Sequence, residues 1–405
     1  MSSIHHLPVE ILHRILSLLP VRELIRCRCV CKAWCSFIIK PDFISTHLNL
    51  HNNIDGHILH HKLGPSGKNF FSILQNKSYV EHSSFGVAFR SETNYIKVVG
   101  SLNGLICLTD SYQFFGRTIY LWNPSIWKLK ILRRSCFARH FTDRGTYFSI
   151  GFGFHYQSND YRIVRIMYFG DVYMPLYVEK KPPRVEVYSL ATNSWRRIGN
   201  NAGYYANDKF SSAFLNGAVH WFASKTGEES SANVVLLFDF DSEKFGEIML
   251  PMYHEDGEGE RPQVSVAVLR ESLALIVCSI SNLRLIEGCY IWVMREYGMV
   301  ESWTKQYSIV PEERIVRPLG IVNNSDFGML MISGVLVSYD LNELAFKHLE
   351  IGDNEVTLDM VNFSESLVLY NEGFRLTPRV EGGIRLGKRK RSVFRQLQKK
   401  WFYER

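Results

Sequence analysis

The first 44 residues have the apolar spacing of short helices, and this spacing stops where the rest of the chain begins. Pro8 and Glu10 suit the first turn of a helix, because proline needs no N–H partner there and a negative charge meets the positive end of the helix dipole. Apolar residues then recur every three or four positions, as on one helical face. These residues are Ile11, Leu12, Ile15, Leu16 and Leu19.

Two further short helices follow. Pro20 ends the first helix and, with Glu23, repeats the start signal before Leu24 and Ile25. A third helix is expected from about Cys31 to Ile39, and Pro41 should end it. A unit of about 40 residues rarely buries enough apolar surface by itself. It is therefore expected to dock on the rest of the chain or on another protein.

The order of these residues resembles an F-box. The resemblance rests on Leu7-Pro8-x-Glu10, Ile15-Leu16-x-x-Leu19-Pro20-Val21, Leu24-Ile25-Arg26-Cys27, Val30-Cys31-Lys32-x-Trp34 and Pro41-x-Phe43. It implies a small three-helix F-box over residues 1–46 that binds the Skp-family adaptor of a cullin ubiquitin ligase. The residues that it implies for adaptor binding, or for holding the helices together, are Leu7, Pro8, Ile11, Ile15, Leu16, Leu19, Pro20, Leu24, Ile25, Val30, Cys31 and Trp34.

The composition is that of a globular protein, with 46% hydrophobic and 21% charged residues over 405 positions. The longest apolar runs, such as Leu273–Ile280, have the length of a buried strand and fall short of a membrane span. The sequence MSSIHH lacks the pattern of a signal peptide. We therefore expect no membrane span and a location in the nucleus and cytoplasm.

The positive charge lies at the two ends. The net charge of +7 divides into +3 for residues 1–48, +8 for residues 384–405 and −4 for the middle. Because the large middle part is mildly acidic, the basic balance alone predicts no nucleic-acid partner.

The eight cysteines predict no metal site. Cys27, Cys29, Cys31 and Cys35 lack the paired spacing of structural zinc sites. Cys27, Cys31 and Cys35 stand at helical intervals, which favours small buried residues. The other four (Cys107, Cys136, Cys278 and Cys289) are expected to be reduced thiols in a β-rich core.

Strand signals dominate after the N-terminal unit. Residues 47–78 are polar and rich in histidine at first, and are interpreted as a linker or as first edge strands. Beyond Tyr79, short apolar runs alternate with turns. Asn103-Gly104 and Asn216-Gly217 each stand between two apolar runs, which predicts tight hairpins.

A longer pattern recurs five times: a strand ends in a polar turn, and an aromatic residue opens the next strand. These aromatic residues are Trp127, Trp195, Phe245, Trp303 and Phe346. Their separations of 43 to 68 residues approach the 40 to 50 residues of a propeller blade. A degenerate, kelch-like β-propeller is expected over residues 79–383, with the aromatic residues in the core between blades, although a less regular all-β body would also fit.

This part also resembles the F-box-associated, kelch-like domain of plant F-box proteins. The resemblance rests on Asn103-Gly104-Leu105, Trp122-Asn123-Pro124, Gly151-x-Gly153 before Asp160-Tyr161, Asn193-Ser194-Trp195 and Asn216-Gly217 before His220-Trp221. It implies a domain that binds a target protein and leaves that target unspecified. The exposed segments 253–263 and 173–183 are candidate binding loops or plain surface insertions.

No catalytic motif, cofactor-binding motif or metal-binding motif was found in the sequence. No catalytic residue and no cofactor are therefore predicted. The basic tail, residues 384–405, contains Lys388, Arg389, Lys390 and Arg391. This cluster is compatible with a nuclear-import signal, with part of a basic amphipathic helix, or with a solvated terminus.

The fold class expected from these patterns is α+β, with a small helical unit before an all-β propeller-like domain. The favoured function is a non-catalytic adaptor that brings a target protein to a cullin-based ubiquitin ligase. Two alternatives remain: an F-box scaffold or decoy without ubiquitination, and an enzyme or nucleic-acid binder on a propeller.

Overall fold

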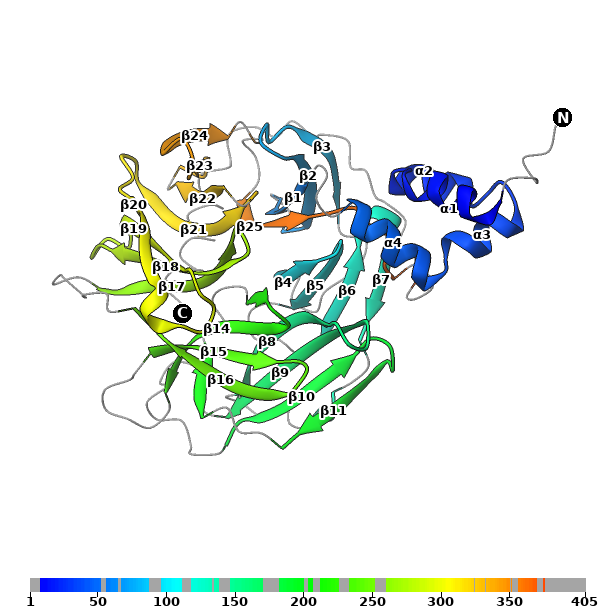
Figure 1. Cartoon of the computed structure of the whole chain (residues 1–405). Helices are drawn as coiled ribbons and strands as arrows, with labels where there is room; N and C mark the ends of the chain where they lie inside the picture. The colour runs from blue at the N-terminus through cyan, green and yellow to red at the C-terminus, as the bar shows by residue number, and fades with distance from the viewer. Residues whose placement is uncertain are drawn as a thin grey trace.

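A computed structural model shows a ring of β-sheets with a small helical unit at its edge (Figure 1). The structure describes residues 8–375 apart from several internal segments. These segments are 52–55, 65–66, 87–95, 111–117, 133–134, 138–145, 170–181, 200–202, 207–211, 226–232, 252–259, 324, 332, 350, 352–355 and 370–373. The basic tail therefore lies outside the described residues, as does Leu7.

Four helices form the N-terminal unit: α1 (Val9–Ser17), α2 (Val21–Cys27), α3 (Lys32–Ile38) and α4 (Pro41–His51). The expectation of three helices is corrected here, because Pro41 begins α4 instead of ending the unit. A proline fits the first helical position, where its missing N–H has no helical partner to lose. The predicted boundary at residue 46 consequently falls inside α4.

The strands form four-stranded antiparallel blades around a ring. The eight-stranded sheet is two blades, because its halves are joined only through the residue pair Ile286–Ile315. From the inner to the outer edge, the described residues give six blades. Blade 1 is β25 (Val356–Phe363), β1 (His57–Leu63), β2 (Asn69–Gln75) and β3 (Glu81–Gly86). Blade 2 is β4 (Ile96–Leu102), β5 (Leu105–Asp110), β6 (Ile119–Asn123) and β7 (Lys128–Ile131), with β26 (Phe374–Arg375) paired to β7. Blade 3 is β8 (Thr146–His155), β9 (Asp160–Phe169), β10 (Arg184–Ser189) and β11 (Ser194–Ile198). Blade 4 is β12 (Tyr204–Ala206) with β13 (Ala213–Leu215), then β14 (Ala218–Lys225), β15 (Asn233–Asp239) and β16 (Lys244–Met249). Blade 5 is β17 (Glu260–Leu269), β18 (Ser272–Ile280), β19 (Ile286–Met294) and β20 (Trp303–Ile309). Blade 6 is β21 (Ile315–Val322), β22 (Asp326–Met331), β23 (Leu336–Asp340) and β24 (Ala345–Leu349).

The ring is closed by strands from opposite ends of the chain. β25 pairs with β1 over seven residue positions, and the inner strands of successive blades contact one another around the circle. Packing each blade against its neighbours buries both sheet faces, which a single hairpin cannot do. The expected α+β class, with a helical unit before a propeller, is confirmed.

Residues 47–78 belong to these two parts and do not form a separate linker. They contain the end of α4 and two strands, and β1 lies between β25 and β2. It is therefore an interior strand, in which His60 and His61 are buried. The polar character of this stretch is accounted for by local partners, since His60 Nε2 lies 2.9 Å from Thr357 Oγ1 and His61 Nε2 lies 2.9 Å from Asn69 Oδ1.

Both Asn-Gly hairpins are confirmed. Asn103 and Gly104 have φ angles of 52° and 73°, and Asn216 and Gly217 have φ angles of 51° and 77°. They join β4 to β5 and β13 to β14. The five recurring aromatic residues stand at the start of the outermost strands of blades 2 to 6, where each packs on a core cluster. Both features follow from one repeated unit, a meander whose turns need fixed backbone geometry and whose outer strand needs an apolar anchor.

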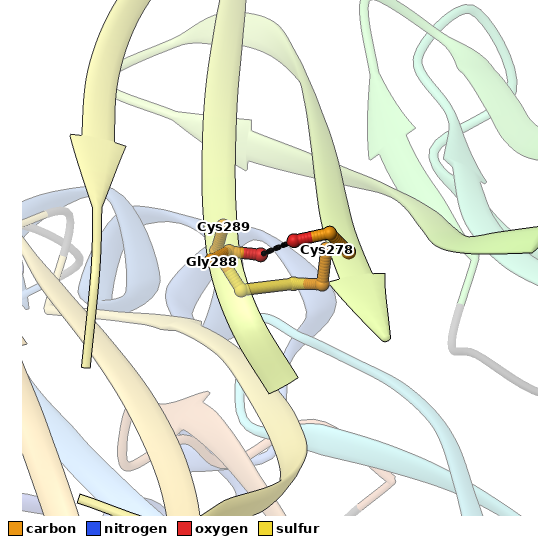
Figure 2. Close-up of a disulfide and its surroundings, with 4 residues drawn as sticks. Cys278, Gly288 and Cys289 are labelled. Atoms are coloured by element: carbon orange, nitrogen blue, oxygen red, sulfur yellow. Dashed lines mark hydrogen bonds between the residues drawn. A yellow bond between two sulfur atoms is a disulfide. The ribbon is translucent and has the colours of Figure 1, made fainter. Parts of the chain in front are cut away.

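The cysteines of the propeller differ from the expectation of reduced core thiols. Cys278 and Cys289 face each other on β18 and β19 and form a disulfide (Figure 2). Beside them, the Ser279 hydroxyl donates to the Gly288 carbonyl at 3.2 Å. Cys107 is a buried free thiol and Cys136 is exposed. The sequence gave no sign of this pairing because the two cysteines are 11 residues apart and become neighbours only through the strand register.

Within the described part of the chain, no helix has the length and apolarity that crossing a membrane requires. The same part of the chain contains no group of three or more histidine, cysteine or acidic side chains arranged to hold a metal ion.

Candidate functional site

The helical unit has an apolar core of its own. Leu16, Val21, Leu24, Ile38 and Phe43 are buried together. The ring of Phe43 also meets those of Phe37 and His13 edge to face, with centroids 5.3 Å and 5.4 Å away. These contacts bring α1, α3 and α4 together, so that the apolar face predicted for α1 is used inside the unit.

Two histidines of α4 fasten it to the end of α1. His47 Nε2 lies 2.8 Å from the Leu19 carbonyl, and His51 Nε2 lies 3.0 Å from the Ser17 carbonyl. The last carbonyls of a helix have no partner within it, so these imidazoles supply the missing donors. Burial lowers the pKa of His47 and keeps its ring neutral, which still leaves one N–H to donate.

The opposite side of α1 exposes apolar side chains. Ile11 and Ile15 are each 47% exposed and Leu18 is 63% exposed. Their spacing of four and three residues places them on one line along the helix. We call Ile11, Ile15 and Leu18 the α1 stripe. Val30, in the turn between α2 and α3, is 65% exposed. An apolar row on the solvent side of a helix, beside a core that is already filled, indicates a surface for a partner.

The structure divides the residues predicted for adaptor binding into three groups. Leu16 and Leu24 are buried and hold the helices together. Leu19, Ile25, Cys31 and Trp34 are partly buried, and the Cys31 sulfur accepts the Trp34 N–H at 3.5 Å at the start of α3. Pro8, Ile11, Ile15, Pro20 and Val30 are exposed. Leu7 lies outside the described residues.

The sequence interpretation missed Leu18 in the stripe and also missed the propeller residues beneath the unit. Leu18 could have been found from its helical phase, because it lies seven residues after Ile11 and opposite the buried Leu16. Ile126 and Leu367 join the core of the helical unit from the propeller. No local signal could have found Leu367, since it reaches the unit only after the ring closes.

The prediction that Cys27, Cys31 and Cys35 occupy one helical face is wrong. Cys27 ends α2, and Cys31 precedes α3 in an extended conformation. All four cysteines of the unit are free thiols, and none is fully buried.

The two ends of the propeller strands differ. At one end the connections are tight turns, and turns of neighbouring blades touch there. Tyr79 donates to Asp326 at 2.8 Å, and the His155 ring lies 2.9 Å from Asp241. We call this end the turn face. The connection β6–β7, at this face, contacts α2 of the helical unit.

The other end, the loop face, carries the longer connections. Residues 170–183 join β9 to β10 there, and residues 250–259 join β16 to β17. Both candidate binding loops of the sequence therefore leave from the face that does not carry the β6–β7 connection. Residues 173–181 and 253–259 are outside the described residues, whereas 260–263 begin β17.

The strongest buried charge pair belongs to the structure of blade 3. Arg165 and Glu186 bond across β9 and β10, and Glu186 also accepts from the Ser135 hydroxyl at 2.6 Å and the Cys136 N–H at 3.0 Å. The Arg165 guanidinium stacks 4.3 Å from the Trp195 ring. Burial lowers the pKa of Arg165, and the charge of Glu186 opposes this effect. Each partner satisfies the other, which is the arrangement of a packing element.

Family comparisons agree with both parts. A model described as F-box-like matches residues 4–51, and one described as F-box associated beta propeller domain matches residues 70–369. The chain belongs to the F-box proteins with an associated propeller domain. Among curated relatives from Arabidopsis thaliana, F-box protein At3g07870 is 27% identical over 86% of this chain and 88% of its own length. F-box/kelch-repeat protein At3g23880 is 28% identical over 79% and 84%. F-box protein CPR1 is 26% identical over 91% and 90%.

Membership of this family explains the two surfaces. F-box proteins in general are adaptors that select targets for ubiquitin ligases and are not themselves catalytic. In this F-box protein, the helical unit matches the F-box and the ring of blades matches the associated domain.

Proposed function

We propose that this F-box protein is the substrate-recognition adaptor of an SCF-type cullin-RING ubiquitin ligase. Its F-box docks on a Skp-family adaptor, and through it on the cullin, while the propeller holds a target protein. The observation that carries the proposal is the α1 stripe: three aliphatic side chains face solvent on a helix whose other side already fills a core. Such a row is costly to leave in water unless a partner covers it.

The adaptor contributes no bond-making group in this scheme. It raises the effective concentration of the target lysine near the ubiquitin-loaded enzyme, because one binding event makes the next encounter intramolecular. The loop face is the proposed target surface. Long connections between rigid strands can vary in sequence without disturbing the blades, and they supply contacts on a fixed frame.

Adaptor docking can be tested with Ile11→Asp and Ile15→Asp in the full chain, measured by binding to a purified Skp-family adaptor. A charge inside a buried apolar contact should weaken binding at least 100-fold. Leu344→Asp is the matched control, because Leu344 is 61% exposed in blade 6 of the propeller. A well-folded wild-type chain that does not bind the adaptor would refute the proposal.

Target delivery needs a separate test. Proteins bound to the propeller in cells should become more abundant when the proteasome is blocked, and the Ile15→Asp variant should remove that response. Bound proteins whose ubiquitination and abundance never depend on the α1 stripe would favour a scaffold or decoy role for the chain.

A further inference from the structure

The segment after the last inner strand forms a seat for the F-box. Beyond β25 the chain runs through Ser366, Leu367 and Val368 beneath blade 2 (Figure 1). Leu367 is 1% exposed and packs with Leu16, Leu24 and other core residues of the F-box. Val368 and Leu369 pack instead into the core between blades 2 and 3. Consecutive residues of one segment therefore join two hydrophobic cores.

Asn123 fixes this segment to blade 2. Its side chain is fully buried at the end of β6. Its amide nitrogen lies 3.0 Å from the Ser366 carbonyl, 3.1 Å from the Ser366 hydroxyl and 2.8 Å from the Val368 carbonyl. Its amide oxygen accepts the Ser125 N–H at 2.9 Å. One side chain thus orders both the segment and the short 3-10 helix η3 (Pro124–Ile126), which contacts α2.

The neighbouring hairpin leaves room for the crossing. A Cβ atom at Gly104 would stand 2.4 Å from the Ser364 carbonyl and 2.5 Å from the Ser366 hydroxyl. The Asn103-Gly104 turn therefore needs glycine for close approach as well as for its positive φ. Ser125 completes the seat, because its hydroxyl accepts the Ser366 N–H at 3.2 Å.

We propose that Asn123 and Leu367 are positioning residues that hold the F-box at one orientation relative to the propeller. Because the seat follows β25, this orientation is set only once β25 has paired with β1 and closed the ring. The inference rests on the proposed function for its meaning: the orientation fixes where a target on the loop face stands relative to the ubiquitin-loaded enzyme. The geometry itself exists in the free chain and can be tested there.

Two variants release the seat in different ways. Asn123→Asp keeps the shape of the side chain but replaces the amide donor with an oxygen that faces the Ser366 and Val368 carbonyls. Leu367→Ala removes the apolar contact with the F-box core. Leu341→Ala is the matched control, because Leu341 is 2% exposed in the core of blade 6, away from the F-box. Leu367→Met is the conservative variant that should restore the contact.

The orientation is read out in the free full-length chain by lysine cross-linking and by hydrogen exchange. Cross-links between F-box lysines (Lys32, Lys40) and propeller lysines (Lys128, Lys130) should form one restricted set in the wild type. Asn123→Asp and Leu367→Ala should broaden this set and speed exchange in α2 by about tenfold or more, corresponding to loss of a few buried contacts. Leu341→Ala and Leu367→Met should keep the wild-type set.

Two outcomes would overturn the inference: wild-type cross-links and exchange in both seat variants, or the same broadening in Leu341→Ala, which would indicate general loosening. Binding of a Skp-family adaptor is measured in parallel. The seat variants should bind it as the wild type does, because the α1 stripe is intact. Failure of the wild type to bind would refute the adaptor function and leave the seat standing, so the two proposals fail separately.

Discussion

The F-box and the propeller use apolar side chains in opposite ways. In the propeller, strands such as β5 are buried along their whole length, and ring closure leaves no blade without two neighbours. In the F-box, α1 buries one side and exposes the three aliphatic residues of the stripe on the other. The propeller is complete as it stands, whereas the F-box is built to be completed by a partner. An apolar residue therefore signals stability in one region and recognition in the other.

The largest expected effect separates the two kinds of apolar residue directly. Phe327→Ala in blade 6 should lower the free energy of unfolding by about 3–5 kcal/mol, because it leaves a cavity at a fully buried position. Leu18→Ala in the stripe should change it by less than about 0.5 kcal/mol and should instead weaken adaptor binding. Chemical denaturation of both variants checks this contrast. Similar losses from the two would mean that the stripe is part of the fold.

The cysteines divide along the same boundary. Four free thiols lie in the F-box, and the disulfide Cys278–Cys289 lies in blade 5. Reduction should lower the free energy of unfolding by up to about 3 kcal/mol, since a cross-link restricts the unfolded chain. Alkylation of the unreduced, denatured protein followed by mass spectrometry should modify Cys27, Cys29, Cys31 and Cys35 and spare the pair. Full alkylation of Cys278 and Cys289 would contradict the structure.

Acid should act on both regions, and more strongly on the propeller. Burial lowers the pKa of His220 to about 4 and, together with the charge of Lys62, that of His60 to about 3. An unfolded histidine has a pKa of about 6.5, so between pH 6.5 and these values the unfolded chain binds protons that the folded chain does not. Stability contributed by the neutral rings is complete above pH 6.5 and falls as the pH drops. At pH 5 each histidine should cost roughly 2 kcal/mol.

The measurement is the free energy of unfolding between pH 7.5 and 5, for the wild type and for His220→Gln. The glutamine variant starts less stable, because the contact of His220 Nε2 with the Tyr297 hydroxyl at 2.7 Å is changed. Its slope with pH should nevertheless be shallower by about 1.4 kcal/mol per pH unit below pH 6.5. An unchanged slope would show that His220 is protonated in the folded protein.

The sequence predicted the fold class and much of the candidate site from local signals. Asn-Gly turns, prolines at helix starts and apolar spacing depend on neighbouring residues, and they located both hairpins and three of the four helices. Features set by closure of the ring escaped: the interior place of β1, the seat at Leu367 and the pairing of Cys278 with Cys289. Each depends on residues that are distant in sequence or on strand register. Pro41 misled for another reason, since proline can begin a helix as well as follow one.

The smallest effect on stability is expected from the basic tail, which lies outside both compared regions. Replacing Lys388, Arg389, Lys390 and Arg391 with alanine should leave the unfolding free energy and adaptor binding unchanged within error. If the cluster is a nuclear-import signal, as we propose, the same variant fused to a fluorescent protein should lose most of its nuclear signal in cells. The matched control replaces Lys399 and Lys400 with alanine and should retain import. An unchanged distribution of the first variant would reject the import signal, and a loss of adaptor binding would instead tie the tail to the F-box.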